Sequence, residues 1–337
     1  MTALQASSPL IACVGPVDTY APSGDHPTGE NSSCRYQVSE PELHMSGQLI
    51  ADEWSTDMAQ VWLITGSSRG IGRKTAEAVL AAGHQLVATA RNPRDLDDLI
   101  SQHGDRVRSV ALDVRDASQA RQAVETAVAE FGRLDVVVNN AGAGRVTSIE
   151  ECSEADFRDQ LEINLMGVVN VTKAALPVLR AQRSGHFLQI GSTAGHTALG
   201  GGLAPYVMAK FALRGFTESL AAECAPFGVK ATIVECGGFQ TDWTGPSLVV
   251  TEPGEDYVPS VGALLDMMRG AHGNMPGDPA RAARVMLDVV AMDEPPLSLL
   301  LGGDAVDMVR LADQARNAEI DKWEHVSRST DFDLEDA

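Results

Sequence analysis

Hydrophobic and polar positions follow two alternating patterns along most of the chain after residue 58. Short apolar runs, typical of buried strands, alternate with longer stretches in which apolar residues recur every three or four positions, as in helices packed on a sheet. The runs predict strands at 61–65, 86–90, 107–112, 136–138, 187–190, 230–234 and 297–301. The longer stretches predict helices at 71–82, 95–102, 117–131, 155–182, 205–225 and 280–290.

This alternation predicts an α/β fold with a doubly wound, seven-stranded parallel sheet of Rossmann type. Each pair of parallel strands needs a crossover, and the predicted helices supply it. We expect a single domain over residues 58–304, with residues 241–274, which carry prolines, glycines and methionines, as a lid. Residues 305–337 are expected to form a C-terminal helix and an acidic tail. Residues 1–57 have no apolar period and are expected to be a disordered extension.

Composition and charge exclude several classes of protein. Of the 337 residues, 44% are hydrophobic and 21% charged, as in ordinary globular proteins. No run of about 18 apolar residues occurs, so we expect no membrane span. The formal net charge is −20, and the two ends (1–57 and 312–337) together contribute −12 of it. So acidic a surface repels phosphate backbones and excludes nucleic acid as a bulk partner.

Cysteine and histidine positions give no sign of disulfides or a metal. The five cysteines are odd in number and lack metal-type spacing, and His186, His196 and His272 have no ligand-spaced partners. We therefore expect no disulfide framework, no metal and a reducing, cytoplasmic location.

A glycine-rich segment, residues 65–72, joins the first predicted strand to the first predicted helix. A strand, a glycine turn and a helix in this order hold a pyrophosphate at the helix N-terminus. Gly66 suits the tight turn, Gly70 lets backbone approach phosphate, and Gly72 allows close helix packing. A plain strand–helix turn is the simpler alternative. A nucleoside-triphosphate loop is excluded, because it needs glycine directly before Lys74 and Arg73 stands there.

Five motifs in order make the sequence resemble the short-chain dehydrogenase/reductase family, in its compact, single-domain, NADP(H)-preferring branch. They are the loop 65–72, the run Asn139-Asn140-Ala141-Gly142, Asn164, Ser192, and the pair Tyr206 and Lys210. The resemblance covers roughly residues 60–301. The sequence departs from the family in three places: Ser192 and Tyr206 are fourteen positions apart, Cys236-Gly237 replaces the usual Pro-Gly, and a charged helix and tail follow the last strand.

The resemblance implies a catalytic set of Asn164, Ser192, Tyr206 and Lys210. A free tyrosine has a pKa of about 10, and a lysine four residues later on the same helical face favours the phenolate. We therefore expect Lys210, helped by the positive charge of the oxidised nicotinamide, to bring the pKa of Tyr206 toward 7, with Tyr206 as the general acid of a carbonyl reduction. Ser192 is expected to bind the substrate oxygen. Asn164 is expected at a local interruption of its helix, holding a water that links Lys210 to solvent.

The cofactor is predicted from the end of the second strand, where NAD-specific folds carry a carboxylate. Here that strand ends in Thr89-Ala90-Arg91-Asn92, and Arg91 with Arg69 suits a 2′-phosphate, so NADP(H) is preferred over NAD(H). Solvated surface arginines are the alternative. The positions that the resemblance assigns to cofactor binding are Gly66, Ser68, Arg69, Gly70, Ile71, Arg91, Asp113, Val114, Asn140, Tyr206, Lys210 and Thr241.

The predicted function is thus an NADPH-dependent oxidoreductase that reversibly reduces a ketone or aldehyde. Trp243, Leu248 and the pair Met267-Met268 in the lid favour a lipophilic substrate. By resemblance, helices near 155–182 and 205–225 pair in a homodimer or homotetramer. Two alternatives remain open: a non-catalytic NADP(H)-binding regulator, which would commonly lack Tyr206 or Lys210, and an NAD-dependent dehydrogenase of a lipophilic secondary alcohol. The spacing of Gly66, Gly70 and Gly72 argues against a sugar-nucleotide epimerase.

Overall fold

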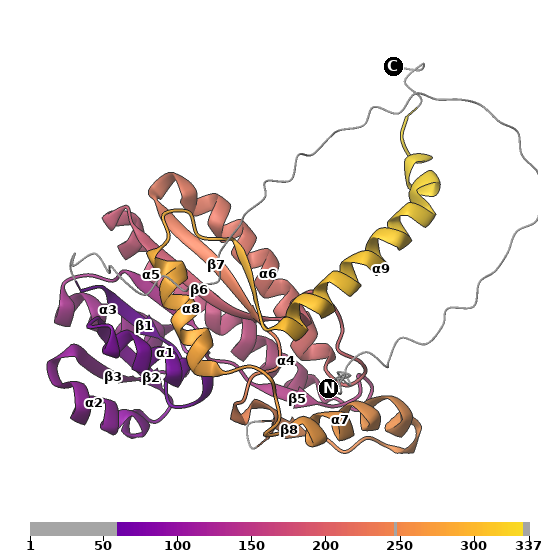
Figure 1. The fold of residues 1–337 in the computed structure, drawn as a ribbon, viewed down its shortest axis with the longest axis horizontal. Helices are drawn as coiled ribbons and strands as arrows, with labels where there is room; N and C mark the ends of the chain where they lie inside the picture. The colour runs from indigo at the N-terminus through magenta and orange to yellow at the C-terminus, as the bar shows by residue number, and fades with distance from the viewer. Residues whose placement is uncertain (1–58, 246–247, 333–337) are drawn as a thin grey trace, which may run out of the picture. The chain divides into compact units, whose positions relative to one another are not determined.

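A seven-stranded parallel sheet forms the centre of the computed structural model, which describes residues 59–245 and 248–332. The strand order is β3-β2-β1-β4-β6-β7-β9 (Figure 1). The strands are β1 (Val61–Ile64), β2 (Gln85–Ala90), β3 (Val107–Ala111), β4 (Val136–Asn139), β6 (Gly185–Ser192), β7 (Val229–Cys236) and β9 (Ser298–Leu301). The predicted Rossmann-type fold is confirmed. The extension predicted for residues 1–57 lies outside the described residues, as do residues 333–337.

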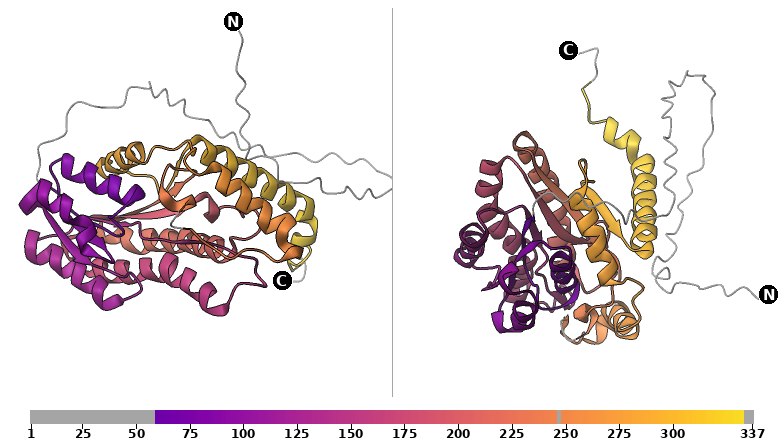
Figure 2. Two further views of the ribbon diagram at one scale, coloured as in Figure 1. Left: turned by 90° about the horizontal axis from the view of Figure 1, so that it is seen from below. Right: turned by 60° about the vertical axis from the view of Figure 1, so that its left-hand side comes forward.

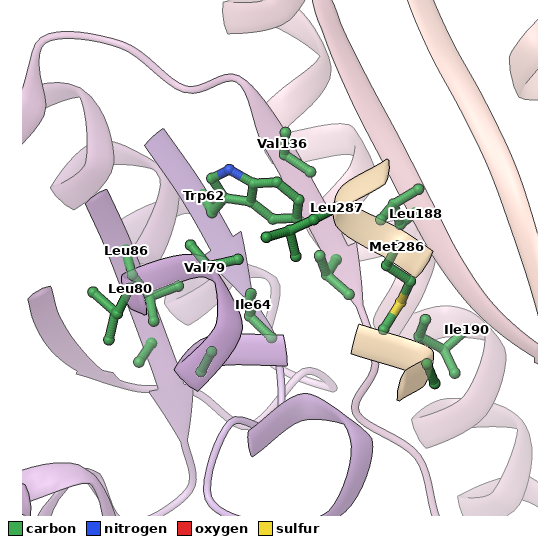
Figure 3. Packing of buried hydrophobic residues seen from close by; sticks show 14 of the residues in the cluster. Trp62, Ile64, Val79, Leu80, Leu86, Val136, Leu188, Ile190, Met286 and Leu287 are labelled. Atoms are coloured by element: carbon green, nitrogen blue, oxygen red, sulfur yellow. The ribbon is translucent and has the colours of Figure 1, made fainter. Parts of the chain in front are cut away.

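Helices cover both faces of the sheet, as Figure 2 shows from two further directions. On one face lie α1 (Gly70–Ala81), α2 (Asp97–His103) and α8 (Pro279–Ala291), and on the other lie α3 (Ala117–Phe131), α5 (Gly167–Gln182) and α6 (Ala204–Cys224). The strands are apolar throughout because both of their faces are buried. In β1, Trp62 and Ile64 pack toward α1 and α8, whereas Val61 and Leu63 pack toward α3 and α5. Figure 3 shows the first of these clusters, in which Met286 and Leu287 of α8 lie against the sheet.

The strand order reverses between β1 and β4, and this reversal positions the site. The chain winds from β1 through β2 to β3 in one direction, and from β4 through β6 and β7 to β9 in the other. In an open parallel sheet, such a reversal leaves a crevice at the carboxyl ends of the strands, where ligands bind. The glycine loop follows β1 and the Asn139-Asn140-Ala141-Gly142 run ends β4, so both meet at this point.

Two features of the lid region were not predicted from the sequence. A second, two-stranded parallel sheet pairs β5 (Gly144–Val146) with β8 (Leu248–Val250), and the lid contains a further helix, α7 (Ala263–Ala271). Each of these strands has only three residues, and the partners lie about 100 positions apart, so no local pattern indicates their pairing.

The long helix predicted over 155–182 is interrupted as expected. The structure has α4 (Glu154–Leu161), a π turn over Glu162–Met166 that contains Asn164, and then α5. At the end of the chain, α9 (Gly303–Arg328) buries Ala305 and Val309, and its later turns are exposed. None of the helices in the described ranges is both long and apolar enough to cross a bilayer.

Candidate active site

The candidate catalytic groups come from α6 and from the carboxyl end of β6. Tyr206 and Lys210 lie one turn apart in α6, and both side chains are buried. Ser192 is the last residue of β6 and stands in register with Cys236, the last residue of β7. The structure thus brings together three of the four residues that the resemblance marks as catalytic, at the edge of the sheet where the crevice opens.

Burial dominates the proton affinity of Tyr206. Removal from water raises the pKa of the Tyr206 phenol well above its usual value, and a hydrogen bond with the Ser192 side chain opposes this rise only in part. The expectation of a pKa near 7 concerns the complex with the oxidised cofactor; in the protein by itself, the cost of burying a phenolate outweighs the effect of the neighbouring lysine. The phenol is held in its protonated form, which is the form that a general acid requires.

Lys210 is held in place beside the Tyr206 ring. Its Nζ donates a hydrogen bond of 2.7 Å to the main-chain oxygen of Ile190 in β6, and lies 5.6 Å from the centre of the Tyr206 ring. Burial lowers the pKa of Lys210 to about 8, opposed by the nearby Cys236 thiol. Burial also raises the pKa of Cys236 to about 12, so that this thiol stays protonated.

Asn164 lies inside the π turn, and its side chain binds the main chain of the segment that follows β4. Its Oδ1 accepts a hydrogen bond from the main-chain nitrogen of Ala143 at 3.1 Å, and its Nδ2 donates to the oxygens of Ala143 and Gln160, both at 2.9 Å. These contacts use both amide protons and one of the two acceptor positions of the side chain. The side chain therefore positions the residue that follows the Asn139-Asn140-Ala141-Gly142 run, and only one lone pair is left for a water.

The glycine loop is tied to the end of β4 by Thr65 and Asn140. The Thr65 hydroxyl accepts hydrogen bonds from the main-chain nitrogens of Asn140 and Ala141, both at 2.9 Å, and Asn140 Nδ2 donates to the oxygens of Thr65 and Gly66 at 2.8 and 3.1 Å. Gly72 faces the same amide so closely that a Cβ would collide with it. Asn140 thus shapes the loop, a role not predicted from the sequence, and Thr65 was not among the predicted site residues although it holds the same loop.

The N-terminus of α1 fits a pyrophosphate. Helices α3, α4 and α8 are capped by the side chains of Asp116, Ser153 and Asp278, but the residue at the same place before α1, Arg69, makes no capping hydrogen bond. The first turn of α1 also carries no acidic residue, so its free N–H groups and positive dipole end remain for an anion. Gly70 has a φ of +59° and faces Thr241 closely, since a Cβ there would lie 3.6 Å from Thr241 Cγ2.

The two arginines predicted to bind a 2′-phosphate are both exposed. Arg69 precedes α1 and Arg91 directly follows β2, and within residues 59–245 and 248–332 neither forms an ion pair. Asp113 is close enough to Arg91 for that charge to help lower its carboxyl pKa, although Arg115 is the larger cause. Val114 is buried against Gly167. Ser68 and Ile71 stand within the loop and first turn, partly exposed.

An apolar wall continues from Tyr206 into the lid. The rings of Tyr206 and Trp243 lie 5.2 Å apart at 50°, and Trp243 lies beside Leu248 over Gly144. Beyond Leu248, between β8 and α7, is a cavity of about 270 Å³. It is lined by Gly245, Leu248, Val250, Leu265, Met268, Arg269 and His272. The lid expected over 241–274 therefore contributes an apolar surface that begins at the candidate acid.

Comparisons with known proteins agree with this geometry. A family model described as short chain dehydrogenase matches residues 60–248. Oxidoreductase BOA17 of Botryotinia fuckeliana (strain B05.10) is 45% identical over 271 residues, which make up 80% of this chain and 98% of the relative.

Two solved structures are also similar. The crystal structure of a short-chain dehydrogenase from Streptomyces avermitilis has a TM-score of 0.77 and 39% identity, and the match covers 82% of this chain and all of that one. An alcohol dehydrogenase from the archaeon Thermococcus sibiricus, solved with 5-hydroxy-NADP, has a TM-score of 0.59 and 28% identity, over 72% of this chain and 96% of that one. The chain therefore belongs to the short-chain dehydrogenase/reductase family, oxidoreductases that act on CH–OH and C=O groups.

Proposed function

We propose that the protein reduces a lipophilic ketone or aldehyde to the alcohol, reversibly, with NADPH as hydride donor and Tyr206 as general acid. The observation that carries the proposal is the buried phenol of Tyr206, whose pKa the Ser192 side chain helps to lower and which lies beside the Lys210 ammonium. NADPH would supply the hydride that becomes bonded to the carbonyl carbon. The protein then has to bind the carbonyl oxygen, stabilise its developing charge and deliver one proton to it.

Each of these tasks has a residue in the described site. The Ser192 hydroxyl donates to the carbonyl oxygen and stabilises the negative charge that develops there. The Tyr206 hydroxyl transfers its proton to that oxygen, and the phenolate left behind is stabilised by the Lys210 ammonium, whose position the Ile190 carbonyl holds. A water bound near Asn164 is proposed to return a proton through Lys210. In the reverse direction the same groups accept the proton from the alcohol.

Preference for NADPH is supported by the charges at the end of β2. Arg69 and Arg91 are exposed and form no ion pair among the described residues, so both guanidinium groups are available to one phosphate. No carboxylate occupies the tip of β2, where an adenosine ribose 2′-hydroxyl would need an acceptor. The uncapped N-terminus of α1 would bind the pyrophosphate.

A lipophilic substrate is supported by the surface that begins at Trp243. The cavity beyond Leu248 is lined mainly by aliphatic and methionine side chains, which favour a hydrocarbon portion next to the reacting carbonyl. We further propose a homodimer formed through α5 and α6, because Met166, Met208 and Phe211 expose about two fifths of their surface at this pair of helices. The cytoplasmic location remains a prediction from cysteine usage.

Replacement of Tyr206 by phenylalanine tests the proposal directly. The variant keeps the ring and its packing on Trp243 but has no proton to transfer, so we expect kcat to fall by about 10³-fold. NADPH oxidation would be followed at 340 nm over a panel of ketones and aldehydes, with NADPH binding measured by calorimetry as the control. Cofactor binding should persist. Wild-type turnover by the variant would remove Tyr206 from its role, and a wild-type protein that binds NADPH but reduces nothing would favour a non-catalytic regulator.

A further inference from the structure

A cluster of polar and charged side chains around one buried carboxylate lies behind the catalytic groups. Glu235 of β7 is fully buried, and its Oε1 lies 2.8 Å from His196 Nε2. Arg214 Nη1 of α6 donates to both carboxylate oxygens, at 3.1 and 3.2 Å, and the Ser298 hydroxyl of β9 donates to Oε2 at 2.6 Å. Arg214 Nη1 also lies 2.6 Å from His196 Nε2, so the three side chains form one compact cluster.

Each member of this cluster lies close in sequence to a residue of the site. His196 lies four residues after Ser192, at the end of the short 3₁₀ turn Thr193–Gly195, and Arg214 lies one helical turn after Lys210 in α6. Glu235 directly precedes Cys236, which stands in register with Ser192. The carboxylate of Glu235 therefore holds the two segments that carry Ser192 and Lys210, and does so from the neighbouring strand.

The two segments are also packed too closely to shift independently. A Cβ on Gly195 would lie 3.0 Å from the main-chain oxygen of Lys210 and 3.6 Å from Glu235 Oε1. Arg316 of α9 donates a hydrogen bond to the main-chain oxygen of His196, from the side of the last helix. The loop after Ser192 is thus fixed between α6, β7 and α9.

We propose that Glu235 is a positioning residue that sets the distance between Ser192 and the Tyr206–Lys210 pair through His196 and Arg214. The inference rests on the proposed carbonyl reduction. The hydrogen bond of Ser192 with Tyr206 depends on the relative position of β6 and α6, and misplacement of reacting groups by about 1 Å costs on the order of 10²-fold in rate.

Stability alone does not account for the buried Glu235 carboxylate and its pairing with the partly exposed Arg214. Apolar residues of similar volume often replace a buried ion pair with no loss of stability, whereas removal of one partner leaves an unpaired charge. Charged partners add directional contacts at defined distances, which apolar packing between the same segments does not supply. This is the property that a pair of catalytic groups on two different elements requires.

Glu235→Gln tests the proposal, because it keeps the size of the side chain but presents an amide N–H₂ toward Arg214. We expect kcat for the carbonyl to fall by about 10- to 100-fold, while KM for NADPH changes less than about twofold. Arg214→Lys, which keeps the charge, should retain most of the activity, and Arg214→Met, which keeps only the packing, should not. A purely packing role for Arg214 would make the lysine and methionine variants alike and would overturn the proposal.

Asp135→Asn is the matched control. Asp135 is also a buried carboxylate paired with an arginine, Arg133, but it precedes β4 at the amino ends of the strands, where its Oδ2 accepts from the nitrogen of Val61 at 2.8 Å. This variant should lower the melting temperature and leave kcat unchanged. A loss of kcat in Asp135→Asn equal to that in Glu235→Gln would show a general effect of stability and contradict the proposal.

A measurement without substrate separates this inference from the proposed function. Amide hydrogen exchange of Glu235→Gln should be faster in residues 193–197 and in the first three turns of α6 than in the wild-type protein, and unchanged in α1. Unchanged exchange in both segments would overturn the positioning role, even if wild-type activity is found. If exchange is faster in Glu235→Gln but the wild-type protein reduces no carbonyl, the positioning role is supported and the proposed reaction is refuted. If Glu235→Gln does not fold, the activities of Arg214→Lys and Arg214→Met test the positioning role in its place.

Discussion

Burial controls the protonation of the catalytic residues in the protein without its cofactor. Tyr206 and Lys210 lie in the same dry environment, which disfavours the charged form of each, so that the pKa of the phenol rises and that of the ammonium falls to about 8. Below pH 8 the pair is a neutral phenol beside a charged ammonium. That pair is ready to donate a proton, and it stabilises the phenolate that donation leaves behind.

The lowered pKa of Lys210 predicts a pH-dependent stability. Between pH 8 and 10.5 the unfolded chain holds a proton on Lys210 that the folded protein has lost, so through this group the stability rises with pH and is lost as pH falls. The raised pKa of Cys236 acts in the opposite direction, but only above about pH 9. From pH 8 to 9 we therefore expect the unfolding free energy of the wild-type protein to gain about 1 kcal/mol relative to Lys210→Met.

Urea denaturation of the cofactor-free proteins at several pH values between 7 and 9 measures this difference. Subtraction of the two curves cancels the titrating groups that Lys210 does not influence, and staying below pH 9 limits the contribution of Cys236. If the unfolding free energies of the two proteins change with pH in parallel, burial does not shift the pKa of Lys210 from its value in the unfolded chain.

The exposed Arg91 predicts a change of cofactor preference. Arg91→Ala removes a guanidinium from the end of β2, so KM for NADPH should rise by about tenfold, the loss of one charge-assisted contact, while KM for NADH stays within about twofold. Arg94, a second arginine in the turn that follows, is exposed and serves as the control when replaced by alanine. Equal effects of Arg91→Ala on both cofactors would refute the role assigned to Arg91.

At the level of elements, α1 and its loop are shaped by contacts that leave no room for a side chain. Gly72 lies against the Asn140 amide and the Gly66 carbonyl, and these two groups also hold the loop to the end of β4. The close approach of helix and strand depends on glycine at this position, whereas some other helical glycines have open space around them. Gly215 in α6, for example, has no atom within 4 Å of its would-be Cβ.

The same substitution in these two helices should therefore have opposite effects. Gly72→Ala forces the Asn140 amide and the loop apart, so we expect a loss of about 1–3 kcal/mol of stability and at least tenfold weaker NADPH binding. Gly215→Ala should stabilise the protein by about 0.5–1 kcal/mol and leave cofactor binding unchanged. Chemical denaturation and calorimetric titration measure both quantities. Tight NADPH binding by Gly72→Ala would contradict the fit of the loop to a pyrophosphate.

For the whole molecule, exposed apolar residues of the described chain gather on α6 and along α9, and the proposed dimer uses those on α6. Met208 and Phe211 are three residues apart on α6, and each leaves 42% of its surface exposed. The net charge of −20 opposes association over most of the surface, so contact is favoured where uncharged, apolar side chains concentrate.

A double substitution of this surface tests the proposed dimer. Light scattering of the wild-type protein should give at least twice the chain mass of 35.7 kDa, and Met208→Glu with Phe211→Glu should give the monomer mass. Leu311→Glu on α9, where an apolar side chain is also about half exposed, is the control and should not change the mass. A wild-type monomer, or a variant that remains dimeric, would exclude this interface.

Local sequence patterns were sufficient to predict the strands, the helices and the glycine loop that identifies the fold. Strand β1 is apolar on both faces, residues 65–72 carry glycines where the chain must turn and approach a phosphate, and the helix predicted over 117–131 matches α3. These features depend on near neighbours along the chain, which a single sequence contains. The motif order was enough to mark Ser192, Tyr206 and Lys210, and the fold brings them to one edge of the sheet.

Only the tertiary structure decided the features that depend on burial or on distant partners. The pKa of Tyr206 was expected to fall beside Lys210 and the oxidised nicotinamide, whereas in the protein without its cofactor it rises, because packing removes the phenol from water. Thr65 contacts Asn140 across 75 positions, β5 pairs with β8 across about 100, and Glu235 of β7 contacts Arg214 of α6. The sequence determined which segments become strands, helices and phosphate loop, and folding determined which side chains lose water and which partners they find.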